Sequence, residues 1–136
     1  MFTGIIQSIG KLKKEKNWVI TSKVLPKGDF DFLKNNFKKS LKNLKREKIN
    51  NLAIHGLNLK QHLDWVLDVE GKKFISWKLE KELVDQVGFS SHGSYSLIKD
   101  AINCEVFTFC SLHLHYLDQS KIALAEEASS AKAILD

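Results

Sequence analysis

The stretch QVGFSSHGSYSLIKDAINCEVFTFCSLH, residues 86–113, decides the fold. Residues 86–91 and 106–113 are short, largely apolar runs without strict alternation, which is typical of strands buried on both faces of a parallel sheet. Between them, residues 95–103 follow Ser94, a favoured helix N-cap, and repeat apolar side chains at helical spacing. The stretch therefore predicts a strand–helix–strand unit with parallel strands.

The same alternation continues toward both ends of the chain. It predicts strands at residues 19–24 and 51–55, helices at residues 31–46 and 75–85, and an alanine-rich helix from residue 120 to the end. Four such strand–helix units form either an open doubly wound sheet or part of a closed (β/α)8 barrel. No glycine-rich nucleotide-binding loop follows any of these strands, so the commonest nucleotide-binding signatures of the open sheet are missing.

Individual residues mark the starts and faces of the predicted helices. Asp29 and Asp31 stand where the lysine-rich first helix should begin, and a negative side chain is favoured there by the unpaired backbone N–H groups. In the next predicted helix, Ile75, Leu79 and Leu83 form the stripe that we expect to be buried.

One segment, residues 56–71, is too long for a routine connection between elements. It is either a functional loop after a strand or a connection that contains a helical turn around residues 61–67.

The composition fits one soluble globular domain: 136 residues, 43% hydrophobic and 27% charged, with one proline. No apolar run approaches the ~20 residues that span a bilayer, and the N-terminal lysines follow the apolar stretch instead of preceding it as in a secretory signal. Cys104 and Cys110 are too few for a disulfide framework. We therefore expect a cytoplasmic protein with reduced thiols.

Positive charge is concentrated in the first part of the chain, where residues 1–50 hold 13 basic and 4 acidic side chains. A basic region can bind nucleic acid or another polyanion. No zinc-finger or aromatic-rich RNA-binding motif accompanies the lysines, so we expect a solvated helix face and regard nucleic acid as an unlikely partner. The lysines in question are Lys34, Lys38, Lys39, Lys42, Lys45 and Lys48.

Polar side chains gather at the carboxyl ends of the predicted strands, where both architectures place their chemistry. They are Lys23, His55, Ser90, Ser91, His92, His113 and His115. His113 and His115 share one face of a strand and could clamp a metal, but no further ligand has metal-site spacing, so no metal site is predicted.

Three stretches follow one another along the chain: VITSKV, SLKNLKREKINNLAIHG and QVGFSSHGSYSLIKDAINCEVFTFCSLHLHY. In this order they resemble the aldo-keto reductases, and the resemblance covers residues 18–136. The resemblance is strongest to the branch with a GFSSHG motif, which often carries an iron–sulfur cluster motif that this chain lacks. It implies a (β/α)8 barrel that transfers hydride from NADPH to an aldehyde or ketone.

By the same resemblance, Lys23 and His55 match the catalytic lysine and histidine, and Ser90 and Ser91 match the pair that holds the nicotinamide carboxamide. Leu112 stands where many relatives place a glutamine beneath the nicotinamide. The lysine would assist proton transfer and the histidine would orient the carbonyl.

The units that bring the family's catalytic aspartate and tyrosine have no counterpart before Trp18, and only about four of eight units are present. We therefore expect a half barrel that has little or no affinity for NADP and that is inactive, or nearly so, by itself. We also expect it to pair with a second copy or with a complementary chain. The alternative is a non-enzymatic half barrel that binds a polyanion or forms oligomers.

Residues 1–17 (MFTGIIQSIGKLKKEKN) resemble something else, the start of riboflavin synthase. In that family the opening Phe and Thr lie at the active site, which would point to Phe2 and Thr3. We expect this segment to lie outside the barrel-like part at residues 18–136, and a riboflavin synthase-related chain is a further alternative.

Overall fold

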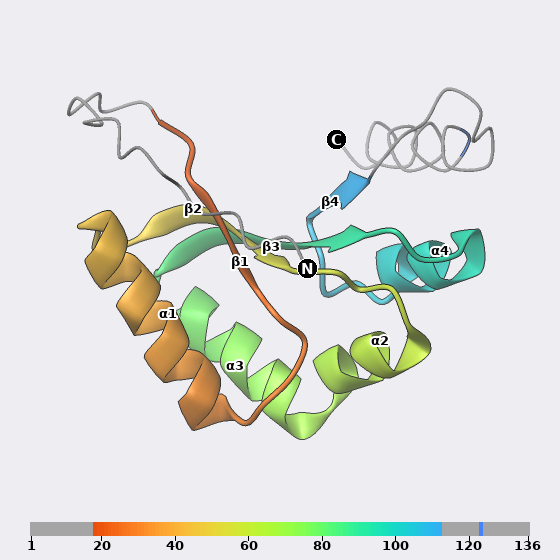
Figure 1. Cartoon of the computed structure of the whole chain (residues 1–136), viewed down its shortest axis with the longest axis horizontal. Helices are drawn as coiled ribbons and strands as arrows, with labels where there is room; N and C mark the ends of the chain where they lie inside the picture. The colour runs from red at the N-terminus through yellow and green to blue at the C-terminus, as the bar shows by residue number, and fades with distance from the viewer. Residues whose placement is uncertain (1–17, 113–122, 124–136) are drawn as a thin grey trace.

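The computed structural model describes residues 18–112 and 123 (Figure 1). Residues 1–17, including Phe2 and Thr3, and almost all of the helix predicted from residue 120 lie outside the described residues. The elements are β1 (Thr21–Val24), α1 (Phe30–Leu44), β2 (Ile49–Ile54), α2 (Lys60–Leu67), α3 (Val69–Glu80), β3 (Val84–Ser91), α4 (Tyr95–Asn103) and β4 (Phe109–Leu112).

The strands form one parallel sheet in the order β1-β2-β3-β4. Figure 1 shows α1, α2 and α3 below this sheet. A doubly wound sheet reverses its strand order and carries helices on both faces, whereas a barrel keeps its strands in sequence with the helices outside. The described residues therefore form part of a barrel, which settles the choice that the sequence left open and confirms the predicted fold class.

Helix α1 begins one residue before the start, and ends two residues before the end, of the predicted range of residues 31–46. The side chain of Asp29 accepts a hydrogen bond from the backbone N–H of Phe32, and Lys45 closes the helix in a left-handed conformation with φ 52°. One face of the helix buries Leu33, Phe37 and Leu41 against the sheet and α3. The amphipathic spacing and the N-cap together account for this helix.

The long segment after β2 holds a helix, α2, and α3 follows it directly. Asp68 ends α2 and also caps α3, since its carboxylate accepts the N–H of Gly71 at 3.0 Å. A Cβ on Gly71 would lie 2.2 Å from the carbonyl oxygen of Trp65, so this tight corner requires glycine.

The prediction for α3 was wrong at both ends and on its face. The helix starts six residues before Ile75 because Asp68 caps it, and Asp85 belongs to β3. Its buried residues are Gly71, Phe74, Ile75 and Lys78, while Leu79 is 44% exposed. Of the predicted stripe only Ile75 is buried, and Lys78 takes an inward position beside it.

The strands are close to their predicted positions. β2 starts two residues earlier than predicted, and β4 is shorter, with residues 106–108 leading into it. α4 occupies the predicted range, and the Ser94 side chain caps it by accepting from Leu97 N–H. No helix among the described residues is long and apolar enough to cross a membrane.

Candidate functional site

Three predicted site residues lie on one face of the sheet near the carboxyl ends of neighbouring strands. Lys23 of β1 is in register with Ala53 of β2, and His55 follows two residues later, just past the end of that strand. Ala53 is in register with Gly88 of β3, and Ser90 again follows two residues later. Because side chains alternate along a strand, Lys23, His55 and Ser90 share a face.

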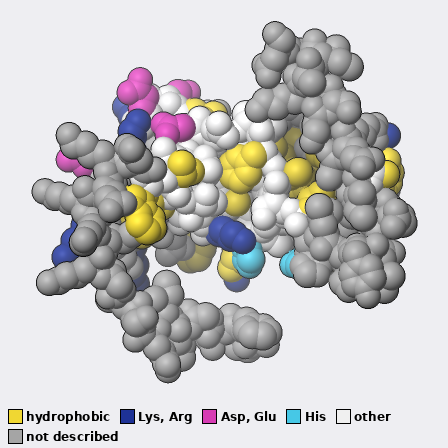
Figure 2. Space-filling model, turned by 90° about the horizontal axis from the view of Figure 1, so that it is seen from above, with side chains coloured by type: hydrophobic (Ala, Val, Ile, Leu, Met, Phe, Trp, Pro, Cys, Tyr) yellow, Lys and Arg dark blue, Asp and Glu magenta, His cyan; other side chains and the backbone are white. Residues whose placement is uncertain are grey.

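This shared face is the side of the sheet opposite α1, α2 and α3, and we refer to it as the open face. Figure 2 looks onto it and shows hydrophobic side chains among polar ones, with a basic side chain beside a histidine. The side chains of Lys23 and His55 are exposed there, whereas Ser90 is 9% exposed.

Hydrogen bonds join the end of β2 to β3 at this point. The hydroxyl Oγ of Ser90 lies 3.3 Å from Nδ1 of His55 and accepts the backbone N–H of Gly56 at 3.2 Å. The backbone of His55 also donates to the carbonyl of Val24 in β1 at 2.7 Å. Gly56 has φ +67°, a left-handed conformation that favours glycine. β1 therefore holds the His55 backbone, and β3 contacts its ring.

Ser91 has different surroundings from Ser90. The Ser91 residue is 2% exposed, and its hydroxyl donates to the carbonyl of Leu57 at 2.5 Å and accepts the N–H of Gly93 at 2.9 Å. These bonds make it a brace between β3 and the chain after β2. Its assignment as a cofactor ligand stays a prediction.

β4 places two residues beside the serine pair. Ser111 is in register with Ser90 and is exposed, while Leu112 is in register with Ser91 and packs half-buried against the core. Ser111, and not Leu112, is therefore the β4 residue beside Ser90. A Cβ on Gly88 would lie 2.6 Å from ring atoms of Phe109, so this ring packs directly on the β3 backbone.

Asn58 is a structural member of this region that the sequence did not reveal. Its side-chain oxygen accepts the N–H of His92 at 2.7 Å, and its own N–H donates to Nδ1 of His62 at 3.2 Å. The only signal for it was its place in the long segment after β2. An asparagine in a turn is common, so that signal is weak.

No group of three or more His, Cys, Asp or Glu side chains within residues 18–112 could hold a metal ion. His113 and His115 lie outside the described residues. Of the two cysteines, burial raises the pKa of the Cys110 thiol, which keeps it in the unreactive protonated form.

Solved structures similar to this chain are named as aldo-keto reductases. One from Pseudomonas aeruginosa has a TM-score of 0.68 and 18% identity, covering 86% of this chain and 46% of that one. One from Brucella melitensis has a TM-score of 0.57 and 18% identity, over 78% and 41% of the two chains. MGS-M4, from a deep-sea metagenome library, has a TM-score of 0.51 and 16% identity, over 77% and 40%.

These likenesses establish the fold of this chain, which spans less than half the length of each neighbour. No protein-family model and no curated protein matches the sequence.

Proposed function

We propose that this chain contributes the Lys23, His55 and Ser90 part of an NADPH-dependent carbonyl reductase site, acting on aldehydes or ketones. The observation that carries the proposal is the convergence of these three residues on the open face, at the carboxyl ends of consecutive strands. In barrels this end of the strands holds the active site.

The residues around Ser90 suit the nicotinamide end of the cofactor. The hydroxyl oxygen of Ser90 accepts one N–H from Gly56 and has a second lone pair for a carboxamide N–H. Ser111 adds an exposed hydroxyl beside it, and the Phe109 ring gives an apolar surface on the same face. Bound NADPH would supply the hydride to the carbonyl carbon.

Lys23 and His55 would act on the carbonyl oxygen. An exposed imidazole on the open face can donate a hydrogen bond to that oxygen, and the ammonium of Lys23 favours the negative charge that develops on it. No residue of this sequence is assigned as the proton donor. Tyr95 and Tyr116 are the two tyrosines of the sequence, and the family resemblance matches neither to the catalytic tyrosine. A missing acid catalyst typically costs ~10²–10⁴ in rate.

We therefore expect the 136-residue polypeptide to bind NADPH weakly and to reduce carbonyls very slowly. A second copy or a complementary chain that extends the sheet beyond β1 or β4 is the proposed partner. Within residues 18–112, β1 and β4 are the two edge strands of the sheet, and an edge strand offers unpaired backbone groups to another chain.

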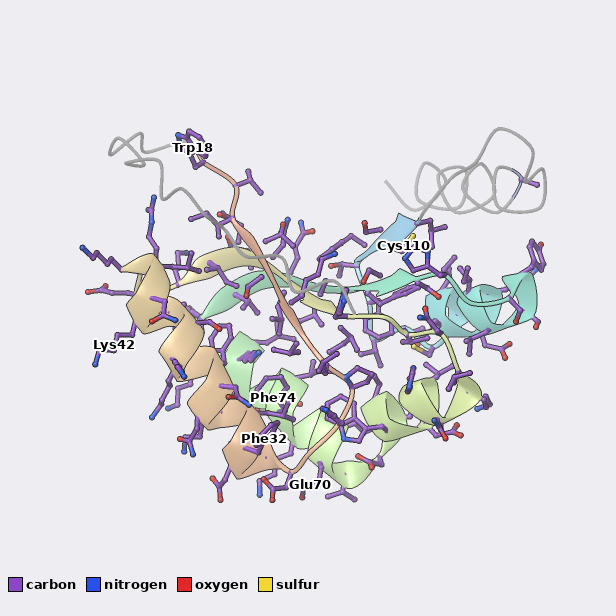
Figure 3. The ribbon with its side chains drawn as sticks, viewed as in Figure 1. Trp18, Phe32, Lys42, Glu70, Phe74 and Cys110 are labelled. Atoms are coloured by element: carbon purple, nitrogen blue, oxygen red, sulfur yellow. The ribbon has the colours of Figure 1, made fainter. Side chains whose placement is uncertain are left out.

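The test is a titration with NADPH followed through the fluorescence of Trp18, Trp65 and Trp77, with an assay on a panel of aldehydes. Saturable binding is expected, together with residual turnover that falls further in Lys23→Ala and His55→Ala. Lys42→Ala is the matched control, because Figure 3 shows Lys42 pointing away from α1 into solvent. Absence of saturable NADPH binding would overturn the proposal, and rapid turnover would refute the expected lack of a proton donor.

A further inference from the structure

The Ser90 hydroxyl stands between two groups that belong to the end of β2. The Ser90 residue is 9% exposed, and its Oγ accepts the N–H of Gly56 at 3.2 Å and lies 3.3 Å from Nδ1 of His55. The β3 backbone reinforces this contact, since the carbonyl of Ser90 accepts the N–H of Leu57 at 2.8 Å. Ser90 is thus fixed by its backbone to the segment that carries the histidine.

The hydrogen atoms at this contact can be assigned by counting donors and acceptors. A serine hydroxyl has one hydrogen and two lone pairs. Gly56 N–H uses a lone pair, so the hydroxyl hydrogen still needs an acceptor, and in a part-buried position a hydrogen without one is costly. Among the described residues, Nδ1 of His55 is the acceptor that lies within reach of the Ser90 hydroxyl. Nδ1 must then carry no hydrogen, and the hydrogen of the neutral ring sits on Nε2.

We propose that Ser90 is a positioning residue that selects this tautomer of His55, so that Nε2–H faces the open side of the sheet as a hydrogen-bond donor. The ligand that it fits is a carbonyl oxygen, and this part of the inference rests on the proposed function. In the other tautomer Nε2 would present a lone pair and would repel the same oxygen. Ser90 therefore acts through the histidine in addition to any contact with a cofactor.

The tautomer can be measured in the ligand-free protein by nitrogen NMR of a histidine-labelled sample at a pH where His55 is neutral. The His55 signals are assigned by comparison with His55→Gln. In the wild type, Nε2 should carry the hydrogen in nearly all molecules. In Ser90→Ala the ratio of the two tautomers should move toward Nδ1–H by about fivefold, the effect of one ordinary hydrogen bond. Ser90→Thr, which keeps the hydroxyl, should restore the wild-type ratio.

Ser111→Ala is the matched control, since Ser111 lies beside Ser90 on the neighbouring strand and is exposed. Its ratio should equal that of the wild type. A hydrogen on Nδ1 of His55 in the wild type, or an unchanged ratio in a folded Ser90→Ala, would overturn the inference. Because no cofactor is present, this outcome is distinct from failure of the proposed function, which the NADPH titration reports.

Discussion

Lys78 and Lys23 lie on opposite sides of the same sheet, and the two lysines differ in exposure and in the groups that surround them. Lys23 is exposed on the open face. Lys78 extends from α3 into the packed helix layer, where it is 0% exposed. Its Nζ lies 3.6 Å from the ring centroid of Phe74 and 3.8 Å from that of Phe37. Figure 3 shows Phe74 within this layer.

The difference lies in hydration. Nζ of Lys78 is a buried polar atom that has no hydrogen-bond partner in the described part of the chain. Loss of water around the ammonium lowers the pKa of Lys78 to about 6. The two ring faces attract a cation, but they do not replace the lost hydration. At neutral pH the Lys78 amine is therefore largely uncharged.

The largest expected effect tests this contrast through Lys78→Met. In the folded state the pKa of Lys78 is about 6, against 10.5 for an ordinary lysine. Between these values the unfolded chain binds the extra proton, so the free energy of unfolding rises with pH across this window and is lowest below it. The full span corresponds to roughly 6 kcal/mol as an upper limit. Methionine fills similar space without a charge, so the variant should be more stable at pH 7 and lose this pH dependence.

Urea denaturation at several pH values between 6 and 10 measures this effect. Lys42→Met is the control, because Lys42 is exposed and projects from α1, and its pH profile should match that of the wild type. Parallel profiles for Lys78→Met and the wild type would mean that the Lys78 amine is charged or hydrated in the folded protein.

A smaller effect is expected from Gly88→Ala, which tests whether the open face is as tightly built as the covered one. The new Cβ would lie 2.3 Å from the carbonyl oxygen of Phe109, a backbone atom that cannot turn away. β3 and β4 must then separate locally, at a cost on the order of 1–3 kcal/mol. A thermal melt against Ser111→Ala, an exposed change on the same face, measures the loss. Equal melting temperatures would show that β4 adjusts freely.

The smallest effect is expected from Lys23→Ala, the counterpart of the change at Lys78. Because Lys23 is exposed and has no ion pair among the described residues, its removal should change the free energy of unfolding by less than about 0.5 kcal/mol. Urea denaturation at pH 7 gives the value. A loss several times larger would place Lys23 in the packing of the sheet and weaken its assignment to a reactive site.

Sequence patterns predicted the helices whose boundaries are set by residues close to them in the sequence. α1 and α4 have a cap residue followed by regular apolar spacing, and Asp29 and Ser94 fill these roles in the structure. α3 failed because its cap, Asp68, also ends α2, and the buried stripe includes a lysine that any hydropathy pattern assigns to solvent. The inward position of Lys78 depends on Phe37, far away in the sequence, and such packing has no local signal.

The candidate site likewise has one part that the sequence predicts and one part that it does not. The ends of the predicted strands indicated that Lys23, His55 and Ser90 lie in one region, because parallel strands align their carboxyl ends, and the register places them on one face. Their roles in a site stay a prediction. The sequence could not show which of Ser90 and Ser91 lies on the open face. Adjacent residues of a strand face opposite sides, so Ser90 contacts His55 while Ser91 is buried against Leu57. Only the register of β3 determines which of the two reaches the open face.

The sequential strand order has a consequence for how the chain assembles. Residues that form hydrogen bonds between neighbouring strands are separated by similar numbers of residues in the sequence. The separation is 30 residues for Asn51 and Thr21, 35 for His55 and Ser90, and 21 for Thr108 and Val87. Because loop-closure entropy grows only with the logarithm of loop length, these three closures differ by well under ~1 kcal/mol. Each described strand can therefore join its predecessor as it emerges during synthesis, and among these four strands no pairing has to wait for a distant part of the chain.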